Sequence, residues 1–490
     1  MNVTCRRLPI LASIALGAVA FAPVAEGASR IVIKGRGFGH GVGMSQYGAF
    51  GFAKNGHTYE QILGHYYTDT KLGKLDSGRQ IRVLLQSGFS GSFSGAEKVS
   101  GHRRLDPKAT YSVARTSKGV ALRTSSGRVI ATYTSPLRVE APSNGSIRLG
   151  GTAANGISGG RYRGALEFRA GAISGLLAIN AVDLEDYVRG VVSKESPSSW
   201  PIEALKAQAV AARTYAITTD KPGDGFEHYA DVRSQVYGGV AAETSSTDEA
   251  VAQTRSQVVT YQGEPVVTYF FSTSGGRTEN VENGFLGAKP APYLKSVKDP
   301  YDKESPRHTW GPYRYTLSRA KSKLGGLVKG NLKRIKVIKR GVSPRIVKAQ
   351  VIGTRGTTTV TGPELRRRFG LYDTWATFTL VTSTAKKAPT GPTGPSSSTK
   401  GDSKSGGATP NARASSSFAP TPSRSPRIVG RVLPSKSGEW LKVQRRAKGR
   451  WVLVAEVTVN RKGRYEASLP RAGSYRIVYK GIAGPTVRAR

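Results

Sequence analysis

The chain has 490 residues, with 74 Lys plus Arg against 32 Asp plus Glu, so its formal net charge is +42. At about 150 residues per domain, this length predicts two or three folded units. Hydrophobic residues make up 38% of the chain, and 59 glycines and 26 prolines leave room for long non-helical stretches. This composition argues against wholesale disorder and against a helical membrane protein.

The N-terminus has the pattern of a secretory signal peptide. An apolar run over residues 8–25 follows two arginines and ends in small residues, so residues 1–28 are expected to be removed and the protein to be secreted. An uncleaved anchor is the alternative, but the run is barely long enough to span a bilayer. Cys5, the only cysteine, would leave with the signal peptide, so disulfides, Cys-ligated zinc and a cysteine nucleophile are not expected.

Residues 30–384 are expected to form the main domain. Strand patterns alternate with Gly and Ser turns across residues 79–178, for example at 81–85, 119–122 and 128–133. The clearest helix is predicted for residues 201–217, where Pro201 fits the first turn, and a second helix for residues 247–254. The predicted fold class is therefore α+β, a mixed, β-rich domain with a few helices.

The C-terminal quarter divides into a linker and a basic β domain. Residues 385–426 are rich in Pro, Thr, Gly and Ser and are expected to be a disordered linker. Residues 427–490 show short alternating strands at 427–432, 440–444, 450–454, 465–469 and 475–479, several of them separated by Gly turns, which predicts a small all-β sandwich. These 64 residues carry 16 Lys plus Arg against 3 Glu, a net charge of +13. Outside the cell such a surface would attract anionic wall polymers or lipid headgroups rather than nucleic acid, unless the charge serves solubility alone.

Glu195 is the first candidate for chemistry. It follows the apolar pair Val191 and Val192 and precedes a Ser-Pro pair, a setting in which a carboxyl can be partly desolvated and its pKa raised. Such a group donates a proton at neutral pH, as cleavage of a glycosidic bond requires. A hydrolase usually adds a second carboxylate, for which the candidates are Asp183, Glu185 and Asp186. A structural capping role is the alternative for all of these acidic residues.

A Gly-rich segment is the second candidate. Glycine occupies every second position from Gly35 to Gly43, so in an extended conformation one face would be bare backbone and the other would carry His40 among larger side chains. A sugar or another chain could approach the bare face closely. The spacing does not match the dinucleotide-binding G-x-G-x-x-G motif. A structural role is the alternative for His40.

An aromatic strand at residues 269–271 runs into hydroxyl side chains and two glycines at 272–276. The backbone N–H groups and hydroxyls there could hold a sugar or an acetamido group, although a hydrogen-bonded turn has the same sequence. The six histidines show no metal-ligand spacing. No metal and no other cofactor is therefore expected.

Together these segments resemble the SpoIID/LytB family, the sporulation stage II D proteins and amidase enhancers of bacterial peptidoglycan. The resemblance covers most of residues 30–380, and its matching stretches are INAVDLEDYVRGVVSKESPSSWPIEALKAQAVAARTYAI (179–217), SQVYGG (234–239), FFSTSGGRTENVENGF (270–285), PYLKSVKDP (292–300), GPELRRRFGLYDTWATF (362–378) and GRGFGHGVGMSQYGAFGFAKNGHTYEQILGHYYTDTKL (35–72). It divides the main domain into a Gly-rich motif segment (35–72), a β-rich part (79–178) and a part with the catalytic motif (179–380).

The resemblance implies a function. Sporulation members are lytic transglycosylases that cut the MurNAc–GlcNAc bond of glycan strands lacking stem peptides, with one essential glutamate in the motif that reads VVSKES here. That residue is Glu195, which would protonate the glycosidic oxygen and then help to close a 1,6-anhydro ring, so that no second carboxylate is required. The expected glycan groove is lined by His40, Ser45, Gln46, Gln235, Tyr237, Ser272, Thr273, Ser274, Gly275 and Gly276. The amidase-enhancer members share these motifs, so the alternative is a scaffold that binds glycan or a wall amidase without cutting.

Two departures from the family pattern stand out. The GHGVGMSQYGA motif usually follows the strand equivalent to TWATF, yet here it precedes the rest of the domain, as in a circular permutation. Residues 35–72 should then pack beside residues 362–378. Some members also carry Cys and His ligands for zinc before the residue equivalent to Gln235, whereas this stretch has His228 but no Cys, which puts that metal in doubt.

Overall fold

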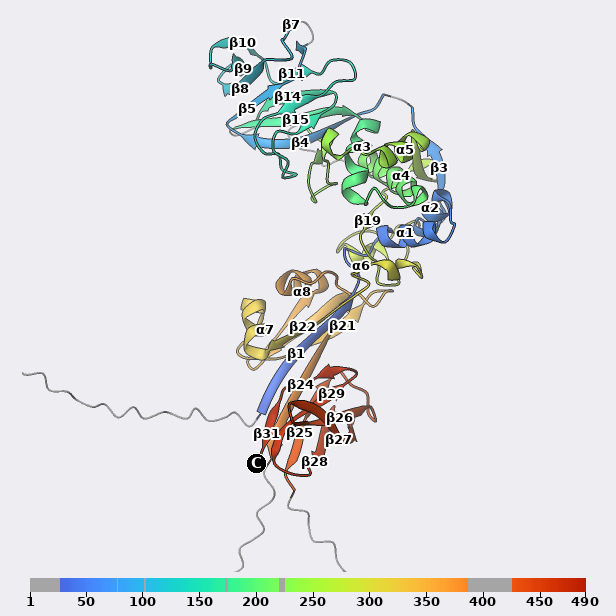
Figure 1. Cartoon of the computed structure of the whole chain (residues 1–490), viewed down its shortest axis with the longest axis vertical. Coiled ribbons are helices and arrows are strands. Elements are labelled where there is room, and N and C mark those ends of the chain that lie inside the picture. Colours follow the sequence, from blue (N-terminus) through green and yellow to red (C-terminus); the bar gives the residue numbers. More distant parts are fainter. Residues whose placement is uncertain (1–26, 77, 101–102, 172–174, 220–224, 387–424) are drawn as a thin grey trace, which may run out of the picture. The chain divides into compact units, whose positions relative to one another are not determined.

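The structure is a computed structural model that describes residues 27–76, 78–100, 103–171, 175–219, 225–386 and 425–490 (Figure 1). It divides into two compact units. The large unit is Ile33–Phe378, and the small unit joins Thr379–Arg490 to the N-terminal residues up to Val32. The predicted signal peptide and nearly all of the predicted linker lie outside the described residues. Strands account for 42% of the structure and helices for 21%, which confirms the predicted β-rich α+β class.

The β-rich half of the large unit contains two sheets with a shared core (Figure 1). The first sheet has the order β16 (His228–Tyr229), β4 (Gln80–Gly88), β15 (Leu176–Asp183), β14 (Ala165–Ala170), β11 (Leu137–Glu140), β6 (Lys98–Val99) and β7 (Arg103–Arg104). The second has the order β10 (Val129–Tyr133), β9 (Gly119–Thr124), β8 (Thr110–Thr116), β5 (Ser90–Ser94), β12 (Ile147–Leu149) and β13 (Arg161–Tyr162). The three strand predictions in this half are confirmed by β4, β9 and β10.

Alternation along β4 explains how one strand serves this core. Ile81, Val83 and Leu85 are buried, while the residues between them keep part of their surface exposed. Because side chains alternate across a strand, these three residues project from one face. They join Phe93 of β5 and Phe168 of β14 in the same apolar cluster.

The helical part follows β15 in the chain. It is built from α3 (Leu184–Glu195), α4 (Ile202–Thr218) and α5 (Ser245–Gln253), with α1 (Gln46–Lys54) and α2 (Tyr59–Tyr66) against α4. Helix α4 is buried on most of its surface because other helices pack around it, and its many alanines permit that close approach. Both predicted helices are confirmed as α4 and α5, with Pro201 as the N-cap of α4.

Short strands and single turns connect these helices. The strand β3 (Lys71–Lys74) pairs with β17 (Gln257–Tyr261), which also pairs with β18 (Glu264–Pro265). In parallel register, β2 (Met44–Ser45) pairs with β19 (Phe270–Phe271). The remaining turns are η1 (Gly239–Ala242), α6 (Val281–Gly284) and η2 (Asp302–Glu304).

The last part of the large unit contains a three-stranded meander of β21 (Leu332–Arg340), β22 (Ile346–Gly353) and β23 (Thr357–Thr361). The same part also contains β20 (Thr309–Thr316), which is not in this meander, and α7 (Leu317–Leu324), η3 (Gly325–Leu327) and α8 (Gly362–Phe369). Thr361 caps α8 by accepting a hydrogen bond from the backbone of Glu364, and Gly370 ends the helix in the left-handed conformation, at φ 66°.

The small unit is a sandwich of two sheets. One contains β1 (Gly27–Arg36), β24 (Ala376–Lys386), β25 (Arg427–Leu433) and β28 (Arg464–Ser468), and the other contains β27 (Arg450–Thr458), β26 (Trp440–Ala447), β29 (Gly473–Tyr479), β30 (Ile482–Ala483) and β31 (Val487–Ala489). Ile428 and Val432 of the first sheet share a core with Leu441 and Ile477 of the second. All five strands predicted beyond residue 426 are confirmed, and β24 supplies a further strand that pairs with β25.

None of the helices in these described ranges has the length and apolar character needed to cross a bilayer.

Candidate functional site

Glu195 is the last residue of α3, which explains how it is presented. Asp183 begins the helix by accepting a hydrogen bond from the backbone N–H of Glu185 (2.9 Å). The apolar residues Val188, Val191 and Val192 bury one face of the helix. Helical geometry stops after Glu195, where the Ser-Pro connection begins, so its side chain stands at the C-terminal end of a well-anchored element.

The Glu195 carboxyl accepts two hydrogen bonds, and the residue is partly buried. Its Oε1 accepts from the backbone N–H of Val236 (3.0 Å), and its Oε2 accepts from Gln46 Nε2 (3.4 Å). Burial raises the pKa of Glu195 above its ordinary value, and the two hydrogen bonds offset only part of that rise. The carboxyl is therefore suited to carry a proton at a pH where ordinary glutamates are ionised.

The three acidic residues considered as partners for Glu195 lie at the opposite end of α3. Ten residues separate Glu185 from Glu195, or about 15 Å along a helix axis. Paired glycosidase carboxylates stand about 5–10 Å apart. Asp183 is the helix cap, and Glu185 is buried in an ion pair with Arg213 Nε and Nη2 (2.9 and 2.7 Å). These candidates therefore lie too far from Glu195 to act as its paired carboxylate, and Asp183 has the capping role that was the alternative.

The Gly-rich segment is not an extended strand beyond Arg36. Gly37, Gly39, Gly41 and Gly43 have φ values of 79°, 134°, 88° and 77°, which other residues rarely adopt. A Cβ atom on Gly43 would lie 2.0 Å from the carbonyl oxygen of Tyr269. The glycines therefore permit a tightly coiled path against neighbouring backbone, and no bare flat face is formed.

This coiled path delivers Gln46 to Glu195. Ser45 pairs with Phe271 through β2 and caps α1 by accepting from the backbone N–H of Gly48 (3.2 Å). Gln46, the first residue of α1, then donates through Nε2 to the backbone carbonyl of Glu195 (2.9 Å) as well as to its carboxyl. Two predicted site residues from distant parts of the sequence are thus in direct contact.

His40 is a neutral, hydrogen-bonded histidine. Its Nδ1 accepts from the backbone N–H of Val42 (3.1 Å), so Nε2 carries the proton and donates to the carbonyl of Phe270 (3.0 Å). Burial lowers the pKa of His40 to about 4. The ring lines a pocket of about 560 Å³ together with Tyr215 and Phe285. Burial raises the pKa of Tyr215, with a smaller contribution from the charge of Glu195.

The segment 272–276 forms a hydrogen-bonded turn. Ser274 Oγ donates to Asp302 Oδ2 (2.9 Å), the backbone N–H of Gly275 donates to the same oxygen (2.5 Å), and Gly276 donates to Ser274 Oγ (3.0 Å). Thr273 is buried and shares a hydrogen bond with Ser305 (2.7 Å). Of this group, Ser272 and Gly276 keep part of their surface exposed.

Gln235 and Tyr237 lie in the core of the large unit. Each is 1% exposed. Gln235 accepts from the hydroxyl of Tyr187 (3.0 Å), and the hydroxyl of Tyr237 donates to Asn180 (2.8 Å). Their burial favours a role in supporting the 236–239 turn, whose Val236 N–H reaches Glu195, over direct contact with a ligand.

The expected packing of the N-terminal motif beside residues 362–378 is confirmed. Gly39 donates to the carbonyl of Tyr372 (3.1 Å), and Arg366 Nη1 donates to the carbonyl of Gly39 (3.0 Å). Phe38 also makes an edge-to-face contact with Tyr372, at 5.3 Å between ring centroids.

One buried charge pair and one buried acid near this motif were missed from the sequence. Arg345 and Asp373 are 2% and 0% exposed, and the guanidinium donates to both carboxylate oxygens (3.0 and 2.8 Å) as well as to the carbonyl of Ser274 (2.8 Å). Asp299, under Gly48, is 1% exposed, and burial together with the charge of Asp302 raises its pKa to about 7. Gly41 packs directly against Arg345: a Cβ atom at position 41 would lie 2.4 Å from the guanidinium, so glycine is required there.

No cluster of three or more His, Cys, Asp or Glu side chains suited to a metal occurs in the part of the chain that the structure describes. His228 is fully buried and its Nε2 lies 2.8 Å from the carbonyl of Ala216. The zinc site of some family members therefore does not fit the residues present at this position.

Comparison with known proteins finds similar sequences. Residues 173–261 match the family model of SpoIID, the stage II sporulation protein. Stage II sporulation protein D of Bacillus subtilis (strain 168) is 32% identical over 211 residues, which cover 40% of this chain and 60% of that protein. The protein of the same name from Bacillus amyloliquefaciens is 31% identical over 211 residues, or 40% and 59% of the two chains.

The amidase enhancer of Bacillus subtilis (strain 168) is 39% identical over 137 residues, which cover 28% of this chain and 17% of that protein. No solved structure gives a match. The family-model match and these relatives support membership of the SpoIID/LytB family. It spans about three fifths of the length of the two sporulation proteins it matches.

Proposed function

We propose that this protein is a secreted peptidoglycan lytic transglycosylase that cleaves the MurNAc–GlcNAc bond. The family and the names of the relatives support a function related to the cell wall. The observation that carries the finer proposal is the Glu195 carboxyl, whose pKa is raised by burial and whose two oxygens are held by Val236 and Gln46. Denuded glycan strands are the proposed substrate.

In this mechanism Glu195 works alone. The protonated carboxyl gives its proton to the glycosidic oxygen as the bond to C1 of the muramic acid breaks. The resulting carboxylate then takes the proton from the C6 hydroxyl of the same sugar while that oxygen attacks C1 and closes the 1,6-anhydro ring. Because the nucleophile belongs to the substrate, the distance of Asp183, Glu185 and Asp186 from Glu195 is no obstacle.

Gln46 has a positioning role in this proposal. Its Nε2 donates to both the main chain and the carboxyl of Glu195, so it fixes the side chain while leaving Oε1 to Val236. The hydrogen bonds that Val236 and Gln46 donate to the carboxyl favour its ionised form, so they limit the rise in the pKa of Glu195 that burial causes. The balance between burial and these donors suits a group that must both give and take a proton.

The alternative is a non-catalytic amidase enhancer, in which the same site binds glycan or a wall amidase without cutting. The similarity to an amidase enhancer favours it. Both functions include glycan binding, but only the transglycosylase forms a cleaved product.

The test is incubation of the full chain, as wild type and as Glu195→Gln, with glycan strands that carry or lack stem peptides. We expect the wild type alone to release products lighter than hydrolysed ones by the mass of one water molecule, read by mass spectrometry. Glu249→Gln is a matched control, because Glu249 is an exposed residue of the neighbouring helix α5. Binding by all variants with no cleavage by any would favour the enhancer function.

The small unit is proposed to hold the enzyme on anionic wall polymer. Residues 427–490 carry a net charge of +13. Arg446 and Arg450 are exposed on the β26–β27 hairpin, so their replacement by glutamine removes charge without touching the core. We expect Arg446→Gln/Arg450→Gln to leave purified wall material at lower salt than the wild type does. Retention that is insensitive to salt in both proteins would contradict this role.

A further inference from the structure

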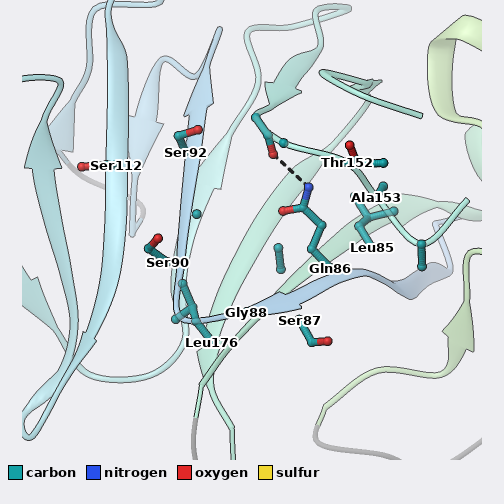
Figure 2. Close-up of a pocket in the computed structure, with 15 residues that line it drawn as sticks. Leu85, Gln86, Ser87, Gly88, Ser90, Ser92, Ser112, Thr152, Ala153 and Leu176 are labelled. Carbon is teal, nitrogen blue, oxygen red and sulfur yellow. Dashed lines mark hydrogen bonds between the residues drawn. The ribbon is translucent and has the colours of Figure 1, made fainter. Parts of the chain in front are cut away.

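A second pocket lies in the β-rich half of the large unit, away from Glu195 in the chain. It has a volume of about 550 Å³ and is formed where β4 and β15 of one sheet meet β5 and β8 of the other, beside the loop 150–154 (Figure 2). Ligand pockets typically enclose about 300–1,000 Å³. The space is thus large enough for one or two sugar units.

The lining of this pocket carries no charge. Its polar side chains are hydroxyls and one amide, namely Gln86, Ser87, Ser90, Ser92, Ser112 and Thr152. In a protein with a net charge of +42, a lining without Lys, Arg, Asp or Glu is a marked local exception. Hydroxyls and amides recognise neutral hydrogen-bonding ligands, whereas an anionic polymer would be held by cations.

Gln86 supplies a specific acceptor. Its Nε2 donates to the carbonyl of Gly150 (2.8 Å), which fixes the amide, and its Oε1 points toward the side of the pocket on which Ser90 and Ser92 lie (Figure 2). Leu176 and Ala178 of β15 add small apolar surface to the lining. An acceptor beside apolar surface suits an acetamido group, which offers one N–H and one methyl.

Gly150 and Ser92 pack closely together in the lining of the pocket. Gly150 has no side chain, and a Cβ atom there would lie 2.0 Å from Ser92 Oγ, so only glycine leaves that hydroxyl in place. Phe89, between Gly88 and Ser90 in the chain, is 85% exposed but is not among the residues that line the pocket.

We propose that this pocket is a second glycan-binding site that takes uncharged N-acetylated sugar units. It would hold a strand at a distance from Glu195, so that successive cuts act on a retained substrate. This role rests on the proposed function, because it assumes that glycan strands are the substrate. Binding of sugar in the pocket itself does not require cleavage at Glu195.

The test places a reporter in the pocket. A fluorine label on the full chain carrying Cys5→Ser and Ser87→Cys is followed by ¹⁹F NMR while an N-acetylglucosamine tetramer is added. We expect a saturable shift that persists in the Glu195→Gln background. Gln86→Leu should weaken the binding about five- to tenfold, as loss of one neutral hydrogen bond does. Val129→Ala is the control, because Val129 is an exposed apolar residue, 53% exposed, in the same half.

Three outcomes would overturn the proposal: a label that does not respond to the tetramer, an affinity unchanged by Gln86→Leu, or equal binding of a glucose tetramer that lacks acetamido groups. The two proposals fail separately. Cleavage without a response of the label would remove the second site alone, and a saturable response without cleavage would remove the transglycosylase alone.

Discussion

The surroundings of Glu195 and the neutral pocket of the β-rich half belong to the same unit but are built in different ways. The first draws Gln46, Glu195 and Val236 from distant segments and fixes them through hydrogen bonds and helix caps. The second is made largely by adjacent strands and carries no ionisable side chain. The contrast teaches that a proton-transfer group needs a costly buried framework, whereas recognition of a neutral ligand can use small polar side chains on a sheet.

The strongest way to break this comparison is to remove a buried charge. Arg345→Met leaves the buried carboxyl of Asp373 without its guanidinium partner, so we expect a loss of about 3–5 kcal/mol in the free energy of unfolding. Chemical denaturation of the full chain measures it. The control is Arg367→Met, because Arg367 is 69% exposed and its ion pair is on the surface.

The double variant Arg345→Met/Asp373→Leu should recover a large part of that loss, since no unpaired charge remains. A single variant as stable as the wild type would mean that the ion pair does not organise the Gly-rich segment.

Asp299 gives the next largest effect and a pH dependence with a definite sign. Its pKa is raised to about 7, whereas an unfolded aspartate titrates near pH 4, so the folded state binds more protons between these values. Stability contributed by this group is therefore present below about pH 4 and is lost as the pH rises to about 7. Asp299→Asn should be more stable than the wild type at about pH 8, by about 2–4 kcal/mol more than at about pH 4.

Thermal unfolding over this pH range measures the difference between the two proteins. Asp76→Asn is the control, since Asp76 is exposed. Parallel pH profiles for Asp299→Asn and the wild type would count against a buried titrating carboxyl.

Gln46→Leu tests the site through its pH profile. The Gln46 bond lowers the pKa of Glu195, so its loss should raise that pKa further and extend the active, protonated form to higher pH. We expect the alkaline limb of the cleavage rate to shift upward in pH, with a fall of about tenfold at the optimum. Gln253→Leu, on the exposed face of α5, is the control. A uniform fall in rate with an unmoved limb would indicate a structural role only.

Replacing one serine by alanine in each region compares how much a single hydroxyl contributes to stability there. Ser45 caps α1 and also accepts from the backbone N–H of Ser274 (3.2 Å), so Ser45→Ala should cost about 1 kcal/mol. Ser90→Ala, on the exposed wall of the neutral pocket, should change stability by less than about 0.5 kcal/mol. Equal costs, measured by denaturation, would erase the distinction between the two regions.

Sequence patterns predicted the elements whose signals are local. Alternation and Gly turns identified the strands of the small unit, and Pro201 with the alanine-rich run identified α4. Helix α3 was not predicted, because Gly190 and the β-branched residues near it have poor helix propensity. Packing of its valine face and the Asp183 cap override that preference.

The site could be predicted only in part. Glu195 was singled out from its apolar neighbours and from the family resemblance, but its contact with Gln46 required the fold. The extended path expected for the glycines was wrong, because alternate glycines are equally compatible with positive φ angles. Arg345 and Asp373 gave no local signal, since an ion pair that joins residues 28 positions apart leaves no periodicity. The neutral pocket was missed because its serines and glycines have the composition of turns.

The contact between Gly39 and Arg366 joins residues 327 positions apart. Synthesis delivers the Gly-rich segment early, but Arg345, Arg366, Tyr372 and Asp373, which hold it, emerge only near the end of the large unit. Until then the segment has no partners that can fix its coiled path, and Gln46 has no fixed direction toward Glu195. The geometry of the Glu195 carboxyl thus depends on completion of the large unit, and we expect a fragment that stops before residue 373 to lack an organised site even where its strands have formed.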